Sequence, residues 1–130
     1  MFERTKALYA DLAATLGLPA LTPDANGGIQ LTIGEDINVI LFGDDDTAIL
    51  AVAPIMPLPD DLSHGATLWL LRKNFYDSGI APFTVACDAA GTLILWGHVP
   101  MSGLTGPRLA GLLDALAAEA KGIRAEIAAE

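Results

Sequence analysis

Few side chains in this sequence have the type and spacing that enzyme chemistry or metal binding requires. His64 and His98 are the two histidines, and neither has a carboxylate or a cysteine at a spacing that would complete a metal site or a proton-transfer pair. Cys87 is the single cysteine and lies in a predicted strand, so we interpret it as a small apolar residue and not as a reactive thiolate. We therefore expect no catalytic residues, no metal site and no cofactor.

Three further features resemble chemical motifs but lack the spacing of those motifs. The run Asp44–Asp46 has adjacent acids, whereas a calcium loop alternates its ligands and adds a Gly and a bidentate Glu at set positions. Ser63 and Ser102 have no nucleophile-elbow pattern around them. The pair Gly27–Gly28 precedes a predicted strand instead of opening a helix, which argues against a phosphate-binding loop. We interpret Asp44–Asp46 as a solvated turn.

The composition favours a protein that binds other proteins. The chain has 130 residues, enough for one domain, and 52% of them are hydrophobic, which is more than a monomer of this size usually needs. Its formal charge of −9, from 16 acidic and 7 basic residues, argues against nucleic acid and anionic membranes as partners. The amino terminus lacks the apolar stretch of a signal peptide, and no apolar run is long enough to span a membrane. Together with the single cysteine, this predicts a cytoplasmic protein.

Hydrophobic periodicity and turn residues predict one α+β domain over residues 1–130. The predicted order is helix, three strands, helix, two strands, helix, and the short turns between neighbouring strands predict antiparallel pairing. The predicted helices are Glu3–Leu16, a second that is capped by Asp60 or Asp61 and runs to about Tyr76, and a third that begins at Thr105–Pro107. The predicted strands are Ile29–Ile33, Ile37–Phe42, Thr47–Ala53, Phe83–Asp88 and Thr92–Val99.

Apolar residues surround the centre of the second predicted helix, which reads Leu68-Trp69-Leu70-Leu71. A helix that is apolar on all sides is buried on more than one side. One side can face the sheet, and a second copy of the chain is the simplest cover for the other. The predicted dimer interface consists of Leu68, Trp69, Leu71 and Phe75.

Apolar residues also occupy strand positions opposite those assigned to the core, namely Ile40, Phe42, Ile94 and Trp96. Either helices cover both faces of the sheet, or one face is a groove for an extended apolar segment of another protein, which can also add as a strand to an open sheet edge. Leu8 and Leu12 would join such a surface if the first helix exposes its flank. The predicted partner-binding residues are Leu8, Leu12, Ile40, Phe42 and Trp96.

Several short stretches, taken with the order of elements, match a known family along the chain from Leu12 to Ile127. The stretches are Leu16–Leu18, a turn with Asp24 and Gly28, then Ile29–Ile33, Leu70–Phe75, Asp88 with Gly91, and Pro100 before an amphipathic helix. In these stretches the chain resembles the CesT/Tir-type chaperones of bacterial type III secretion. Its low isoelectric point of about 4.4 is also typical of that family.

The resemblance implies a homodimer, joined largely through the second helix and adjacent strands, that uses no cofactor and hydrolyses no nucleotide. It also implies that the amino-terminal segment of a secreted effector wraps around apolar patches in a non-globular form. The same fold occurs in YbjN-like relatives that are not tied to secretion, so an interaction or regulatory module is a second hypothesis. An enzyme is a third, and it requires a deep polar pocket that His64 or His98 lines together with a carboxylate.

Overall fold

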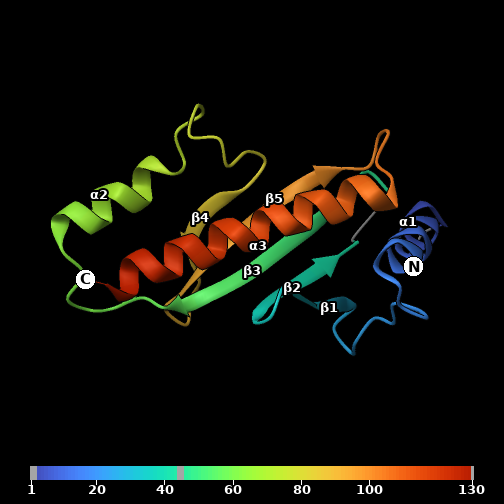
Figure 1. The fold of residues 1–130 in the computed structure, drawn as a ribbon, viewed down its shortest axis with the longest axis horizontal. Helices are drawn as coiled ribbons and strands as arrows, with labels where there is room; N and C mark the ends of the chain where they lie inside the picture. The colour runs from blue at the N-terminus through green and yellow to red at the C-terminus, as the bar shows by residue number, and fades with distance from the viewer. Residues whose placement is uncertain (1–2, 44–45, 130) are drawn as a thin grey trace.

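The computed structural model describes residues 3–43 and 46–129, which form three helices and five strands (Figure 1). The helices are α1 (Glu3–Leu16), α2 (His64–Arg72) and α3 (Gly106–Ala128). The strands are β1 (Gly28–Ile33), β2 (Ile37–Phe42), β3 (Ala48–Pro57), β4 (Thr84–Cys87) and β5 (Thr92–Pro100). This order confirms the predicted α+β architecture. Within the described residues, no helix is both long and apolar enough to cross a membrane.

The five strands form one antiparallel sheet in the order β1-β2-β3-β5-β4. The first three strands are a meander, as the short turns predict. β5 then pairs with β3 along most of its length, so that β4 becomes an outer strand. β3 extends beyond the predicted end at Ala53 to Pro57, and its pairing with β5 shifts register between Pro54 and Met56. Proline lacks the N–H group that a regular ladder needs, so a bulge at this position is expected.

α3 lies across one face of the sheet and supplies much of the core (Figure 1). Thr105 caps the helix, because its hydroxyl oxygen accepts a hydrogen bond from the Arg108 backbone N–H at 3.2 Å. Apolar residues then recur at helical spacing on the side that faces the strands. Those that are fully buried include Leu109, Leu113, Leu116 and Ile123.

α1 packs against the amino-terminal end of α3 at one end of the sheet (Figure 1). The Asp11 carboxylate accepts a hydrogen bond from the Gly106 backbone N–H at 2.6 Å, which joins α1 to the first turn of α3. The two backbones approach closely there, since a Cβ atom on Gly106 would lie 2.6 Å from the Asp11 carbonyl carbon. At its amino-terminal end, α1 is capped by the Asp46 carboxylate. This carboxylate accepts hydrogen bonds from the Thr5 backbone N–H and from the Thr5 hydroxyl, each at 3.1 Å.

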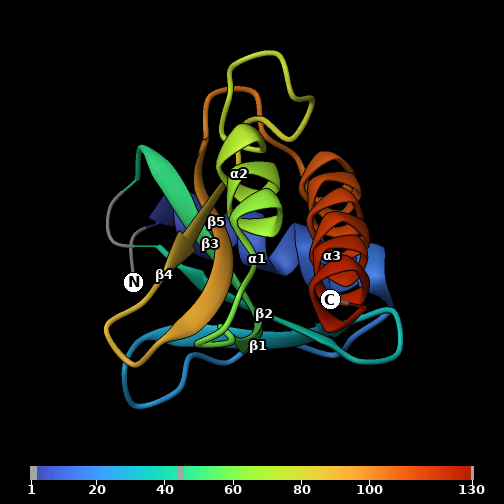
Figure 2. The same ribbon diagram turned by 90° about the vertical axis from the view of Figure 1, so that its left-hand side faces the viewer.

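α2 is shorter than the sequence predicts at both ends. It begins after Ser63, whose hydroxyl accepts from the Ala66 N–H at 3.0 Å, and not after Asp60 or Asp61. It ends at Arg72 instead of near Tyr76, because the residues that follow form hydrogen bonds outside the helix. α2 stands beside α3 on the same side of the sheet (Figure 2). The Lys73 ammonium joins the two helices through the Glu119 carboxylate at 2.9 Å.

Candidate functional site

The face of the sheet opposite α3 carries a band of apolar side chains. Along the three central strands β2, β3 and β5, buried residues that face α3 alternate with half-buried or exposed residues that face away. Among the described residues, no helix packs on this second face, which we call the open sheet face. Of the two alternatives that the sequence left open, the arrangement with helices on both faces is therefore not the one found in the described residues. The large apolar side chains of the open sheet face include Ile40, Phe42, Leu50, Val52, Ile94 and Trp96.

Cross-strand pairing makes this band continuous. Ile40 lies opposite Val52, and Val52 lies opposite Trp96, so one row of apolar side chains crosses three strands. Phe42 lies opposite Leu50 in the next row. The band extends toward β1 because Gly28 has no side chain there: a Cβ atom at that position would lie 2.9 Å from the Phe42 ring. A larger residue at position 28 would displace the Phe42 ring.

The strand positions of the open sheet face carry no Asp, Glu, Lys or Arg among the described residues. Its polar members are Gln30, Thr32, Asn38, Thr84, Thr92 and His98, of which all but His98 cannot ionise in the physiological range. The whole chain carries 23 acidic or basic residues, from 16 acids and 7 bases. Their absence from these five strands leaves an apolar surface suited to an uncharged, apolar partner segment.

A second apolar surface lies on α2 and the turns that follow it. Leu71 is 62% exposed, Phe75 57% and Tyr76 85%, and the rings of Phe75 and Tyr76 are in contact with centroids 4.6 Å apart. Trp69 is half-buried beneath the Lys73 ammonium, which lies 4.6 Å from its ring centroid. We call Leu68, Trp69, Leu71, Phe75 and Tyr76 the α2 surface. Exposed large apolar side chains in one cluster are typical of a protein interface.

The structure does not bring Leu8 and Leu12 to any partner surface. Leu8 is 6% exposed and Leu12 is fully buried. Both belong to the hydrophobic core, because α1 turns this flank inward when it packs against α3. The prediction that these two residues bind a partner is therefore wrong for the folded chain.

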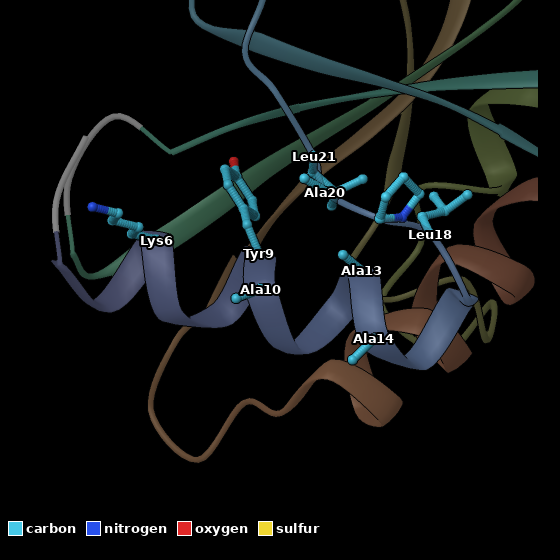
Figure 3. A pocket seen from close by; sticks show the side chains of 9 residues that line it. Lys6, Tyr9, Ala10, Ala13, Ala14, Leu18, Ala20 and Leu21 are labelled. Atoms are coloured by element: carbon cyan, nitrogen blue, oxygen red, sulfur yellow. The ribbon is translucent and has the colours of Figure 1, made fainter.

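α1 instead exposes a flank of small residues (Figure 3). Ala10 and Ala14 are exposed there, and the chain returns past the helix through residues 18–21. Between them lies a groove of about 480 Å³, whose lining includes Lys6, Tyr9, Leu18 and Leu21. Such a groove can hold one apolar side chain, and it is adjacent to no candidate catalytic group.

The candidates for chemistry are not assembled into a site. His64 begins α2, whereas His98 lies on the open sheet face with its ring 5.7 Å from that of Trp96. Neither histidine lines the groove beside α1 or the 330 Å³ groove between α2 and β4. Cys87 is exposed on the outer strand β4, so its prediction as a buried apolar residue is wrong.

The acidic turn and the rest of the surface add no metal site. Asp44 and Asp45 lie outside the described residues, and Asp46 caps α1 as described above. Across residues 3–43 and 46–129, no three His, Cys, Asp or Glu side chains gather closely enough to hold a metal ion. The described surface therefore offers apolar contact area instead of an assembled reactive centre.

Four members of these surfaces were not predicted as site residues, among them Ile94, which was expected to face away from the core but was not assigned to partner binding. Leu50 and Val52 lie in a predicted strand that is apolar on both faces, so alternation could not show which residues face outward. Tyr76 was placed within the second helix, whereas it lies in a turn beyond Arg72. An aromatic pair just before the glycine at position 79 was the available signal for it.

Comparisons with known proteins give one consistent result. A model described as the Tir chaperone protein (CesT) family matches residues 7–124. A search of curated proteins by sequence gave no match. The fold is similar to a chain in the heterodimeric ExoU–SpcU complex from the type III secretion system of Pseudomonas aeruginosa. That chain is 25% identical, with 91% of this chain and 95% of that chain covered and a TM-score of 0.77.

Two further structures have the same fold at lower identity. One is the Yersinia pestis type III secretion chaperone SycH in complex with a stable fragment of YscM2, at 22% identity, with 91% of this chain and 98% of that chain covered and a TM-score of 0.75. The other is the ExoT–SpcS complex from Pseudomonas aeruginosa, at 21% identity, with 95% and 100% covered and a TM-score of 0.74.

Proposed function

Because the chain belongs to the Tir chaperone protein (CesT) family, we propose that it is a cytoplasmic chaperone that binds a segment of a secreted effector protein. It acts as a homodimer and holds this client segment in an extended form. It carries out no reaction and needs no cofactor. A similar fold occurs in a solved chaperone–effector complex and in a type III secretion chaperone bound to a protein fragment, which supports a protein client.

The observation that carries this proposal is the open sheet face, which is apolar, uncharged and free of covering helices within the described residues. Ile40, Phe42 and Trp96 are its predicted client contacts. A client segment with apolar side chains would cover the part of these half-buried residues that is still exposed to water, and each Å² of apolar surface buried favours binding by about 25 cal/mol. A partner with a charge against this face would leave that charge desolvated and unpaired, which disfavours binding.

Charge outside the face agrees with a protein partner. The net charge of −9 repels phosphate backbones and anionic lipid, and it favours neutral or basic client segments. The acidic surface also keeps an apolar-rich protein soluble before its client arrives. Type III secretion chaperones are cytoplasmic in general, and membership of this family is the basis for the proposed location.

The α2 surface is the proposed dimer interface, through Leu68, Trp69, Leu71 and Phe75. Ala66 and Leu70 face the core, so α2 packs on its own chain along one side, while Leu71 is 62% exposed on another. A two-fold axis near this helix would place the same apolar cluster of a second copy against it, which is the usual geometry of a homodimer.

The experiment that tests the proposed function is capture of a partner with tagged protein from the native host, followed by limited proteolysis of the captured complex. We expect one dominant partner, protected over a stretch near its amino terminus. A stable dimer that captures no such partner would reject the secretion chaperone and favour an interaction module of the same fold.

A further inference from the structure

The two outer strands of the sheet, β1 and β4, differ in how their free edges are used. An outer strand has unpaired N–H and C=O groups at every second residue, which can pair with a strand of another chain. In β4, Val85 has its backbone N–H and carbonyl pointing away from β5, toward the free edge. Its N–H donates to the Asn74 Oδ1 at 2.6 Å, and its carbonyl accepts from the Asn74 Nδ2 at 3.0 Å.

A side-chain amide reproduces the donor and acceptor of a peptide group, so Asn74 takes the place of one residue of a neighbouring strand. The segment that carries it is anchored on two sides. Lys73 binds Glu119 on α3 at 2.9 Å, and the Ser78 hydroxyl donates to the Lys73 carbonyl at 2.5 Å. Asn74 is thus held against β4 by its own turn. Its contact leaves Cys87 as the next outward-facing residue of this four-residue strand.

The β1 edge is open over a longer stretch. At its start, the Gly28 N–H donates to the Asp24 carboxylate at 3.0 Å and the Gly28 carbonyl accepts from the Asp24 N–H at 2.8 Å. The Gly28 backbone groups thus point to the free edge of β1, away from β2. Alternation places the backbone groups of Gln30 and Thr32 at the same edge. These two residues have no hydrogen bond to another described segment on that side. With respect to the part of the chain that the structure describes, four backbone groups are therefore available on β1.

We propose that Asn74 closes the β4 edge to strand pairing, whereas β1, among the described segments, keeps free backbone groups at Gln30 and Thr32. Closure prevents the β4 strands of two copies from joining into one continuous sheet. An open apolar edge of that kind is a site of self-association.

The test compares the unmodified protein with Asn74→Ala and Asn74→Ser, neither of which can bridge both backbone groups of Val85. Asn26→Ala is the control, because the Asn26 side chain is exposed and makes no hydrogen bond to the described residues. Amide hydrogen exchange is measured residue by residue at several protein concentrations, and sedimentation velocity gives the sizes of the species. Far-UV circular dichroism establishes that each variant is folded.

In the unmodified protein we expect the Val85 amide to exchange about tenfold more slowly than the amides of Gln30 and Thr32, the factor that a hydrogen bond of ordinary net strength supplies. In both Asn74 variants this difference disappears at low concentration. At high concentration, larger species form and the amides of Val85 and Cys87 become protected again, which a purely structural role for Asn74 would not produce.

Two results would overturn the proposal. One is equally fast exchange of Val85 and Gln30 in the unmodified protein. The other is faster exchange in the Asn74 variants without concentration-dependent protection of β4. Because every measurement uses this protein alone, the failure of a client to appear in the capture experiment would leave these results unchanged.

Discussion

The contact between α1 and α3 can be tested with one substitution made at two places in the same helix. Gly106 and Gly111 are both in α3, but only Gly106 has a neighbour within 4 Å of where a Cβ atom would lie. At Gly106 that atom would be 2.6 Å from the Asp11 carbonyl carbon and 2.7 Å from its carboxyl carbon. At Gly111 it would meet open space. Gly106→Ala and Gly111→Ala should therefore have opposite effects on stability.

The expected sizes follow from these distances. Ordinary contacts of a Cβ atom begin at 3.4 Å, so Gly106→Ala must push α1 away from α3 and weaken the hydrogen bond between the Asp11 carboxylate and the helix N–H. Forced overpacking costs about 1–3 kcal/mol, and we expect a loss of about 2 kcal/mol in the free energy of unfolding. Gly111→Ala should gain up to about 1 kcal/mol, because alanine is the better helix former. The two variants should differ by about 3 kcal/mol.

Urea unfolding followed by circular dichroism measures this difference, with all proteins at one fixed concentration because dimerisation contributes to stability. A slope of about 2 kcal/mol per molar urea is typical of small domains, so the two midpoints should lie about 1.5 M apart. If Gly106→Ala is as stable as Gly111→Ala, the close packing of α1 on α3 is wrong.

Three other predictions concern the dimer and the helix caps. Leu71→Asp should give a folded monomer in sedimentation velocity, because it places a charge in the proposed interface. Ala118→Asp, on the exposed side of α3, is the control and should leave the dimer unchanged. A dimeric Leu71→Asp protein would contradict the assigned interface. Asp46→Ala should lower the free energy of unfolding by about 1 kcal/mol while Asp46→Asn retains most of it, and equal losses in urea unfolding would exclude the capping role. Thr105→Ala should cost about 1 kcal/mol for the same reason, and a thermal unfolding midpoint equal to that of the unmodified protein would rule out the cap of α3.

Local signals in the sequence predicted the elements whose ends depend on neighbouring residues. α3 begins where Thr105 caps it, and α1 spans the predicted Glu3–Leu16. The end of α2 depends instead on Asn74, whose amide binds Val85 at a distance of 11 residues along the chain. Helical periodicity carries no information on such a bond. It therefore predicted a helix that continues to Tyr76.

The candidate surfaces were predictable to the extent that burial follows strand alternation. Ile40, Phe42 and Trp96 lie on the open sheet face because their neighbours along each strand face α3. Leu8 and Leu12 form an apolar stripe at helical spacing, and such a stripe shows only that some surface covers it. The surface that covers them is α3, about 100 residues away in the chain. Placing them required the tertiary arrangement.

The central claim is that the open sheet face holds the client, and the most direct measurement is the affinity of the captured partner for Trp96→Asp. Trp96 is half-buried in the middle row of that face, so a carboxylate there would be desolvated and unpaired under a client segment. Isothermal titration of the purified partner should show binding at least about tenfold weaker than to the unmodified protein, a loss of about 1.4 kcal/mol or more, while Ala118→Asp binds normally. If folded Trp96→Asp binds the partner as tightly as the unmodified protein does, the open sheet face is not the client site.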